Sequence, residues 1–587
     1  MVFILGINSA YHESSCCILK NGKIIAIGEE ERFNRIKHAK RPLPSNPDEL
    51  PLQSISYCLK EAGISWHQID HVGYSFVPIL RLQNIDIDNK TATKGWWWKT
   101  VEGETLFYRK ILTIPQKLSS IADCDIEKKF KWIEHHVCHA SSAYFCSPFN
   151  SAAILSVDGI GEFATTWIGH GKYNQIQKLK EIEYPDSIGF LWETFCRFLG
   201  FSLYDASKLM GLAAYGDSKQ YIRQFKKLIK ISKRGFRVPD SIFELQKEGM
   251  KRLENLFEKP RLPDENIQRR HTDIAAGLQE ITNEIMINLA REAYDLTKEE
   301  NLCISGGVAL NCISNYFIQK ESGFKRVYVQ PASHDAGTAI GAALYIWNHL
   351  LGNKKEYAMP HPYFGPQYSN SEIKQAIEAC SLNKSNGFTV RYVKDIEKEA
   401  ARMIADGNVV SWFQGRMEVG PRALGNRSLL ADPRDPTIRD FINKKIKHRE
   451  DFRPLASSIL DNEAKNWFKF PKRSLWASSQ FMVIAYPCQH NKITRIPAVL
   501  HRDNTSRIQT VDKKYNSRYY KLIQEFEKIT DVPILLNTSF NDQEPIVCAP
   551  KEAIDTFVKT EIDALAIGNY LIKKKDSHTR FLSENNR

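Results

Sequence analysis

The same order of strands and turns is predicted twice in the first 172 residues, and this repetition constrains the fold more than any other feature of the sequence. In each copy an apolar strand ends in a polar loop, a second apolar strand follows, and a turn containing glycine comes next. The copies comprise strands at 3–7, 14–19 and 24–27 around Asn21-Gly22, and strands at 153–157 and 164–168 before Gly171-Lys172. Asn-Gly between apolar runs is the strongest short signal for a β-hairpin. Both copies are therefore predicted to form small β-sheet units.

Two such units, each with a polar loop between its first two strands, resemble the duplicated architecture of actin-like ATPases. In that architecture the paired loops face one another across a nucleotide cleft. Sequence identity between the two copies is low, so the repeat is one of pattern. On this pattern alone, two unrelated hairpins are the favoured interpretation.

Length and composition indicate a large globular protein with more than one domain. The chain has 587 residues, of which 42% are hydrophobic and 25% are charged, as in folded domains rather than disordered chains. No apolar run reaches the roughly 18 residues of a membrane span. The N-terminal residues lack the basic and apolar regions of a signal peptide, so a cytoplasmic location is expected.

Cysteine spacing and net charge narrow the chemistry further. The 12 cysteines are scattered and none forms a Cys-x-x-Cys pair, which excludes the common zinc-ribbon spacing and is typical of reduced thiols. The formal net charge is +13. Such a charge suits nucleic acid, an acidic membrane surface or small phosphate-bearing substrates.

Two α/β domains are predicted, at residues 1–355 and 356–587. The boundary lies in the segment 352–371, because this segment contains three prolines and a charged turn. The main predicted elements on either side are a helix from Thr272, strands at 302–304, 327–329 and 409–413, and a helix at 396–405 capped by Gly407.

Two histidines one helical turn apart are the sharpest local feature. His135 and His139 share one face of a predicted helix, so both imidazoles can reach a single ion. Asp158 and Asp335 stand at predicted strand ends and add carboxylates, and the four side chains suit Fe(II), Mn(II) or Zn(II). The alternative, a histidine cluster on the surface or at a helix cap, is the commoner origin of a lone His-x-x-x-His pattern.

Two further patterns indicate phosphate binding. Ser305-Gly306-Gly307 follows a predicted strand and can present backbone N–H groups to a phosphate, although tight turns also need glycine for steric reasons. In the second domain, residues 416–453 contain ten Lys or Arg against six acids. The glycines and the proline among these cations argue against a simple solvated basic helix. Residues 535–541 are predicted as a strand that ends in polar donors.

Three adjacent tryptophans, Trp96–Trp98, lie between two lysines. They can stack on a planar or sugar ligand or act as a lid. Packing is the more usual role of tryptophan, so both interpretations stay open.

Specific motifs occur along nearly the whole chain. They are Gly6-Ile7 with His12-Glu13-Ser14, Glu30-Glu31-Arg32-Phe33 with Lys37-His38, His135-His136-x-x-His139-Ala140, Lys208-Leu209-Met210-Gly211-Leu212-Ala213, Ser305-Gly306-Gly307-Val308-Ala309, Gly420-Pro421-Arg422-Ala423-Leu424-Gly425-Asn426-Arg427-Ser428, Arg449-Glu450-x-Phe452-Arg453-Pro454 and Asn537-Thr538-Ser539-Phe540-Asn541. In these motifs the chain resembles the O-carbamoyltransferase family, which includes the tobramycin, cephalosporin and nodulation carbamoyltransferases.

The resemblance implies a fold and a two-stage reaction. The first domain would be actin-like and metal-dependent, and the second a twisted α/β domain of the adenylate-forming threonylcarbamoyl-AMP synthase type. Carbamoyl phosphate and ATP would give a carbamoyl-adenylate in the second domain. A hydroxyl group of the acceptor, such as an antibiotic, toxin or glycan precursor, would then attack its carbonyl in the first domain.

The resemblance also implies roles for individual residues. Iron, or another divalent metal, would be bound by His135, His139, Asp158 and Asp335. The acceptor hydroxyl would be activated by His12 as general base, and Lys37 would contact the intermediate. ATP with Mg and carbamoyl phosphate would be held by Lys208, Ser305, Gly306, Gly307, Asn311, Arg416, Lys447, Arg449, Arg453, Arg507, Asn537 and Ser539.

The expected partners are a small hydroxyl-bearing acceptor and a second copy of the chain, with no membrane and no nucleic acid. Three alternatives remain: a tRNA threonylcarbamoyl-adenosine type of modification enzyme, an actin-like sugar kinase, and a scaffold that keeps an inactive fold. AMP with pyrophosphate would indicate adenylate chemistry, whereas ADP would indicate a kinase. Salt-sensitive binding of tRNA would indicate the first alternative.

Overall fold

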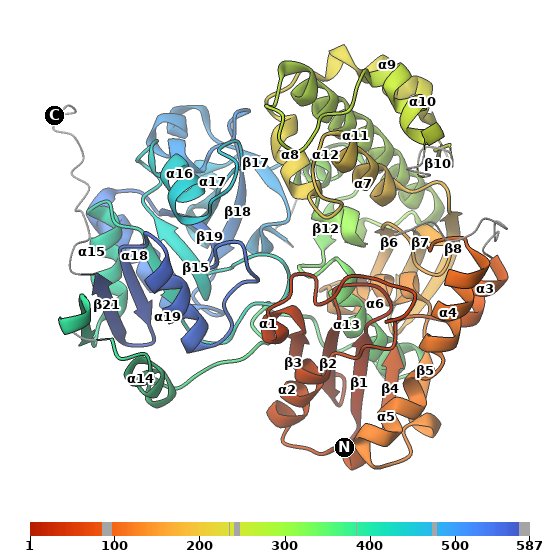
Figure 1. Ribbon diagram of the computed structural model, residues 1–587, viewed down its shortest axis with the longest axis horizontal. Coiled ribbons are helices and arrows are strands. Elements are labelled where there is room, and N and C mark those ends of the chain that lie inside the picture. The colour runs from red at the N-terminus through yellow and green to blue at the C-terminus, as the bar shows by residue number, and fades with distance from the viewer. Residues whose placement is uncertain are drawn as a thin grey trace. The chain divides into compact units, whose positions relative to one another are not determined.

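A break after Met359 divides the chain into two units, and it falls in the segment where the sequence predicts a domain boundary (Figure 1). The computed structural model describes residues 1–84, 97–233, 235–239, 243, 247–382, 384–471 and 478–574. Trp96 lies outside the described residues.

The predicted repeat is present in unit 1 as two sheets of equivalent topology. The strands are β1 Phe3–Asn8, β2 Ser15–Lys20, β3 Lys23–Glu29, β4 His71–Tyr74, β5 Phe130–Trp132, β6 Ser151–Val157, β7 Ala164–Lys172, β8 Gln175–Glu183, β11 Asn301–Ser305 and β12 Arg326–Val329. The sheet orders are β3-β2-β1-β4-β5 and β8-β7-β6-β11-β12. In both sheets the central strand is antiparallel to the strand that follows it and parallel to its other neighbour. The interpretation as two unrelated hairpins is therefore wrong.

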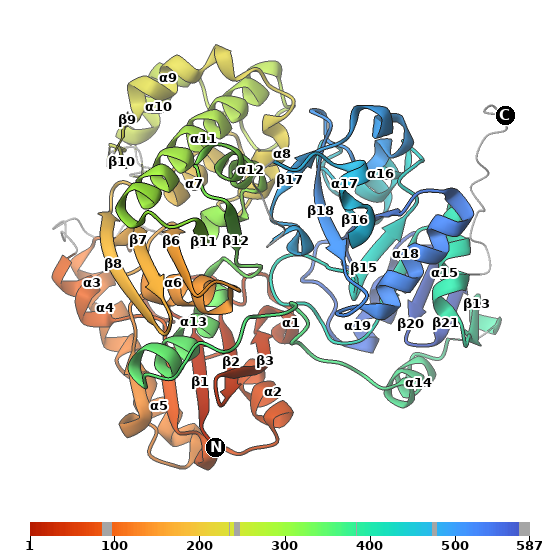
Figure 2. The same ribbon diagram turned by 180° about the vertical axis from the view of Figure 1, so that it is seen from behind.

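Helices cover the two sheets in matching layers. The helices are α2 Leu52–Ala62, α6 His135–Cys146, α11 Arg269–Thr297 and α13 Thr338–Leu344. The first sheet contacts α2 through β2 and β3, and α13 through β1, β2 and β4; the second contacts α6 and α11. The inner helices α6 and α13 pack on each other between the sheets (Figure 1), and Figure 2 shows α11 along the second sheet.

Glycines allow backbones to touch in this core. A Cβ atom at Gly341 of α13 would lie 1.7 Å from the carbonyl oxygen of Cys138 in α6, and one at Gly6 of β1 would lie 1.9 Å from the carbonyl oxygen of Ala339. Both distances are far below van der Waals contact, so only glycine fits. The α6 and α13 helices are thereby held backbone to backbone.

Two local predictions are wrong, and packing explains one of them. The turn predicted at Gly171-Lys172 lies within β7, where Gly171 makes room for the ring of Tyr144. The helix predicted to be capped by Thr272 begins earlier, at Arg269, and the Thr272 hydroxyl donates to the Arg269 carbonyl.

Unit 2 contains a mixed sheet and flanking helices. Its described strands are β13 Phe388–Tyr392, β14 Val410–Phe413, β15 Arg427–Ala431, β16 Ala456–Leu460, β17 Ala485–Pro487, β18 Thr505–Val511, β19 Ile534–Ser539, β20 Ala564–Ile567 and β21 Tyr570–Lys574, in the order β13-β21-β20-β14-β15-β19-β16-β18-β17. The main helices are α14 Asn370–Ala379, α15 Ile396–Ala405, α18 Ser517–Thr530 and α19 Pro550–Lys559. The predicted α/β class is confirmed. None of the helices in the described parts of either unit is both long and apolar enough to cross a membrane.

Candidate active site

The four predicted metal ligands meet at the centre of unit 1. His135 and His139 occupy the first and second turns of α6, Asp158 directly follows β6, and Asp335 begins a short 3-10 turn between β12 and α13. Each of the four side chains offers a ligand atom, and these atoms all lie within 4.8 Å of one another. The prediction that these residues lie together is confirmed.

The spacing of the ligand atoms fits one divalent cation. The Nε2 atoms of His135 and His139 are 3.1 Å apart, and Asp158 Oδ2 lies 2.9 Å from the second of these nitrogens. Asp335 Oδ1 lies 3.5 and 3.6 Å from the two nitrogens. Metal–ligand bonds of about 2.1 Å place neighbouring ligands about 3 Å apart in octahedral geometry. The donor set is therefore suited to a borderline metal that keeps open positions for substrate.

Electrostatics favour positive charge at this point. Burial opposes a charged His135, but Asp335 and Asp158 outweigh burial and hold the pKa of His135 well above its ordinary value. Burial likewise opposes ionisation of Asp158, yet hydrogen bonds from both histidines hold the pKa of this carboxyl well below its ordinary value. A bound divalent cation takes the place of the protons that the site otherwise attracts.

Neighbouring groups orient the ligands. His135 Nδ1 lies 3.3 Å from the carbonyl oxygen of Ser75. Donation of the Nδ1 proton to this oxygen leaves Nε2 free to bind a metal. The backbone N–H of His135 donates to Glu162 at 3.0 Å, and burial raises the pKa of Glu162 to about 7. The sequence analysis missed Glu162, because a single acid in a glycine-containing loop gives no spacing signal.

The Ser305-Gly306-Gly307 turn lies against the metal ligands. The N–H of Gly307 donates to Asp158 Oδ1 at 3.0 Å, and the Ser305 hydroxyl donates to the carbonyl oxygen of His139 at 2.8 Å. Gly306 has φ +85°, and a Cβ there would lie 2.2 Å from the carbonyl oxygen of Val157. The turn therefore holds the end of β6 in place, and its predicted contact with phosphate stays a prediction.

The loop between β1 and β2 brings His12 to the same centre. His12 Nδ1 lies 3.4 Å from Asp335 Oδ2, whereas the other oxygen, Oδ1, is the one nearer to the two histidine ligands. The loop also meets the β6–β7 loop, since the Tyr11 hydroxyl donates to the Gly161 carbonyl at 3.2 Å. The two equivalent loops therefore contact each other, as in the actin-like interpretation of the repeat and not in the favoured one of two unrelated hairpins.

A second pair of titratable side chains adjoins His12. His38 Nδ1 lies 2.5 Å from Glu13 Oε1, and the ring of Tyr204 contacts the rings of His12 and His38 with centroids 5.3 and 4.6 Å apart. Lys37 is exposed in the loop that follows α1 (Glu31–Asn34), and its charge acts on the neighbouring His38.

Two other predicted residues of unit 1 have local partners. Lys208 lies on α8 (Ala206–Ala213) and pairs with Asp205 at 3.1 Å. The Asn311 side chain caps α12 (Cys312–Glu321) by accepting from the Ser314 N–H and donates to Gln279. These contacts give Asn311 a structural role, and its predicted contact with substrate is untested.

Three of the predicted arginines of unit 2 form a cationic cluster. Arg449 is half-buried and donates to the Asn443 side chain at 2.9 Å. Burial with the nearby charges of Arg453 and Arg507 lowers its pKa to about 9, although Glu450 acts in the opposite direction. Guanidinium forks bind phosphate oxygens in proteins, and the contact of these three residues with phosphate stays a prediction. We call Arg449, Arg453 and Arg507 the arginine cluster.

The other predicted residues of unit 2 are held by separate contacts. Lys447 is buried and donates to the Ser539 hydroxyl at 3.1 Å and to Asn541 at 2.7 Å. Arg416 donates to the carbonyl oxygens of Phe364 and Gly365. Asn537 is buried within the sheet and donates to the Ser458 hydroxyl at 2.9 Å. The structure therefore joins Lys447 with Ser539.

Trp97 and Trp98 pack within unit 1. Trp97 stacks on Phe107, and the guanidinium of Arg81 lies 4.0 Å from the centre of the Trp98 ring. Arg81 is buried and pairs with Glu104 at 2.7 Å. Packing, the more usual role, accounts for these two tryptophans.

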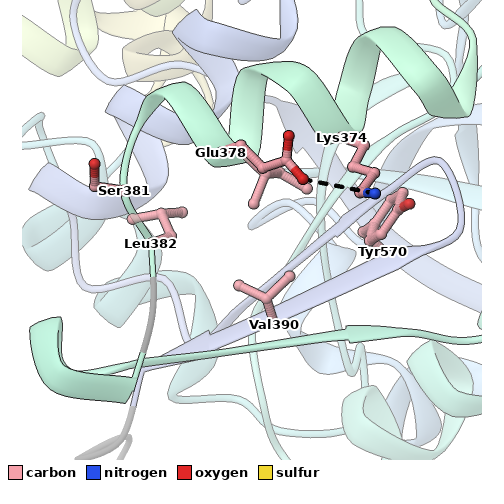
Figure 3. Close-up of a pocket in the computed structure, with 7 residues that line it drawn as sticks. Lys374, Glu378, Ser381, Leu382, Val390 and Tyr570 are labelled. Carbon is pink, nitrogen blue, oxygen red and sulfur yellow. Dashed lines mark ion pairs between the residues drawn. The ribbon is translucent and has the colours of Figure 1, made fainter.

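A cavity of about 430 Å³ lies at the edge of the unit 2 sheet, beside α14, β13 and β21 (Figure 3). Its lining residues are Lys374, Ile377, Glu378, Ser381, Leu382, Val390 and Tyr570. Lys374 and Glu378 pair with each other at 3.6 Å, so the charges of the cavity are balanced internally. No predicted site residue lines it.

Comparison with known proteins agrees with these motifs. The profile described as carbamoyltransferase N-terminus matches residues 3–344, and that described as carbamoyltransferase C-terminus matches residues 401–574. The chain belongs to the carbamoyltransferase family and is an enzyme of that class. The predicted family is confirmed.

The chain is similar to relatives over most of its length. An uncharacterized protein of Synechocystis sp. is 36% identical, and the match covers 98% of this chain and 97% of that protein. The nodulation protein NolNO of Sinorhizobium fredii is 35% identical, with 97% of this chain and 80% of that protein covered. Component A of (R)-2-hydroxyglutaryl-CoA dehydratase from Acidaminococcus fermentans, a solved structure, is 18% identical with a TM-score of 0.31, and covers 59% of this chain and 98% of that chain.

Proposed function

We propose that this carbamoyltransferase makes a carbamoyl-adenylate in unit 2 and transfers its carbamoyl group to a hydroxyl of a small acceptor in unit 1. Unit 1 would be an actin-like domain and unit 2 an adenylate-forming domain of the threonylcarbamoyl-AMP synthase type. The observation that carries the proposal is the position of His12, 3.4 Å from a carboxylate of the metal centre.

Adenylate formation is assigned to the arginine cluster, with Lys447 and Ser539 as further binding groups. Water releases phosphate from carbamoyl phosphate, and an oxygen of the resulting carbamate attacks the α-phosphorus of ATP, displacing pyrophosphate. The substrates carry several negative charges, which the cationic segment of unit 2 can neutralise. Arg416 would contribute a phosphate contact from its position beside Phe364 and Gly365.

Transfer is assigned to unit 1. His12 takes the proton of the acceptor hydroxyl while its oxygen attacks the carbamoyl carbon, and AMP leaves. Asp335 beside Nδ1 favours the tautomer protonated there, which leaves the lone pair of Nε2 to accept the proton. A divalent cation, which we propose to be iron, would be held by His135, His139, Asp158 and Asp335. When bound, it supplies Lewis acidity towards phosphate or carbonyl oxygens.

The test is incubation with labelled carbamoyl phosphate, ATP and a panel of hydroxylated metabolites. Product with the mass of one added carbamoyl group, released together with AMP and pyrophosphate, supports the proposal. Release of ADP would instead indicate an actin-like kinase. Carbamoylation of tRNA with strong salt dependence would indicate a nucleic-acid substrate.

A further inference from the structure

The loop between β6 and β7 caps the helix that carries both histidine ligands. The carboxylate of Glu162 in this loop accepts the backbone N–H of His135, the first residue of α6, at 3.0 Å. Glu134, which occupies the N-cap position itself, pairs instead with Lys178 at 3.8 Å. The first N–H groups of a helix have no partner within the helix and are stabilised by such an acceptor. Glu162 therefore fixes the turn of α6 that bears His135.

A pair of helices holds Glu162 in place. They are α3 (Pro78–Asn84) and α4 (Val101–Ile111), which pack on each other (Figure 1). The N–H of Val77, just before α3, donates to the Glu162 carboxylate at 2.7 Å, and Arg81 Nη1 donates to the Glu162 carbonyl oxygen at 3.2 Å. One segment of the chain therefore binds Glu162 both at its side chain and at its backbone.

A bidentate ion pair determines the direction of the Arg81 guanidinium. Its Nε and Nη2 atoms donate to the two carboxylate oxygens of Glu104 on α4 at 2.8 and 2.7 Å, and only 3% and 2% of the two side chains are exposed. The guanidinium is planar, so these two bonds fix the direction of Nη1, which meets the Glu162 carbonyl oxygen. Because the desolvation of both charges offsets their attraction, a buried pair of this kind adds little net stability. What the pair provides is a fixed direction for the third N–H.

The same pair adjoins the loop of the proposed base. The Arg81 guanidinium lies 4.0 Å from the centre of the Trp98 ring, and the centroids of the Trp98 and Tyr11 rings are 6.3 Å apart. Tyr11, the residue before His12, donates from its hydroxyl to the carbonyl oxygen of Gly161 at 3.2 Å. Adjacent carbonyl groups of the β6–β7 loop are therefore held by two side chains, those of Tyr11 and Arg81.

We propose that Arg81 and Glu104 are positioning residues of the metal centre. Glu104 orients Arg81, which holds Glu162 in place. Glu162 in turn keeps His135 at the spacing from His139 that binding of one divalent cation requires. The inference rests on the proposed function, because it requires that a cation bind at these histidines. Both residues act on the ligands through the β6–β7 loop, as outer residues do at many metal sites.

The test measures the affinity of the full-length protein for Zn(II), by competition with a chromophoric chelator. Zn(II) is the probe because a donor set of two imidazoles and two carboxylates suits it. The His139→Ala variant, which lacks one ligand, gives the affinity of the remaining sites. The thermal midpoint and the rate of pyrophosphate release are measured on the same preparations.

The decisive variant is Arg81→Met/Glu104→Gln. It removes both charges and keeps an amide oxygen for the Lys99 N–H, which donates to Glu104 at 3.1 Å. Glu104→Gln alone is the milder change, because it keeps the Arg81 donor. Lys180→Met/Glu292→Gln is the matched control, since Lys180 of β8 and Glu292 of α11 form another pair between two elements of unit 1, at 2.7 Å.

We expect Arg81→Met/Glu104→Gln to bind Zn(II) about tenfold more weakly than the wild type, which is the effect of losing an outer residue at a metal site. Its thermal midpoint should stay near that of the wild type, because no unpaired charge is left buried. Glu104→Gln should weaken Zn(II) binding and also lower the midpoint, since Arg81 loses its counter-charge. The control pair should leave the Zn(II) affinity unchanged, and pyrophosphate release should be the same in all variants.

Two results would overturn the inference alone. One is wild-type affinity for Zn(II) in Arg81→Met/Glu104→Gln, which would leave the pair a purely structural role. The other is an equal loss of affinity in the control pair, which would trace the effect to packing in general. If the double variant does not fold, Glu104→Gln decides by the same criterion. If the wild-type protein binds Zn(II) no more tightly than His139→Ala does, the cation site of the proposed function fails, and the inference fails with it.

Discussion

The two units arrange buried charge in opposite ways. At the centre of unit 1, two histidine nitrogens and two carboxylates lie within 4.8 Å of one another, so the site attracts positive charge. In unit 2, the guanidinium groups of the arginine cluster disfavour one another, so that site attracts negative charge. We proposed a cation in unit 1 and phosphate groups in unit 2, and the following experiments test this contrast from the largest expected effect to the smallest.

Removal of the cation from unit 1 should have the largest effect. Chelation, or His139→Ala, is expected to reduce carbamoyl transfer roughly ten-thousandfold, because the ligand set loses its function as a whole. The variant should remain folded, since α6 keeps its packing on α13. Transfer and bound metal are measured together, with His170→Ala on β7 as the control. Full activity of metal-stripped enzyme would refute the assignment of the centre.

Substitution of the proposed base, His12, should separate the reaction proposed for unit 1 from the reaction proposed for unit 2. His12→Asn is expected to reduce transfer about a thousandfold, in the range of general base catalysis, while pyrophosphate release stays intact. Both rates are measured on the same preparation. A parallel loss of both rates would favour one shared site over the two-site scheme.

Substitution within the arginine cluster should give the converse result. Arg449→Ala is expected to reduce pyrophosphate release about a hundredfold, and chemically supplied carbamoyl-adenylate should restore transfer. Arg449→Lys should recover little, because a single ammonium group does not reproduce the guanidinium fork. Arg402→Ala, an exposed change on α15, is the control. If Arg449→Ala keeps wild-type pyrophosphate release, the anion site lies elsewhere.

The smallest effect concerns a buried charge outside both centres. Lys40 donates to the carbonyl oxygens of Asn46 and Glu49, and burial lowers its pKa to about 8. The unfolded chain binds this proton more tightly, so Lys40 contributes a rise in stability between about pH 8 and the ordinary lysine pKa near 10.5. Lys40→Gln should remove that rise, as measured by urea midpoints across this interval. If the urea midpoints of the two proteins change equally with pH, burial does not lower the pKa of Lys40.

The sequence predicted those features that depend on local spacing. His135 and His139 could be paired because one helical turn joins them. Apolar runs placed seven of the ten described strands of the two sheets, whereas β4, β5 and β8 were not predicted. The favoured interpretation of the sequence missed the equivalence of the two sheets, because the sheets share their strand order and not their residues. Register between distant strands depends on packing that a single sequence does not display.

Other parts of the site could not be predicted because their partners are distant in the sequence. Glu162 gives no spacing signal in the sequence, and only the fold places its carboxylate against the backbone N–H of His135. Asn311 lies in a predicted binding motif, yet its side chain caps a helix. Gly171 indicated a turn, whereas its role is to admit an aromatic ring. In each case a tertiary neighbour decides the role of the residue.

The backbone contact between α6 and α13 bears on which metal the enzyme acquires. Because Gly341 locks the two helices together, the ligands on α6 and next to α13 keep their spacing before any ion arrives. A preformed site of this kind does not select its metal by folding around it. The Irving–Williams order then favours copper and zinc over iron or manganese at equal concentrations. For the cation site that we propose, we therefore expect the metal content to follow supply during synthesis, so that protein produced in different media contains different metals.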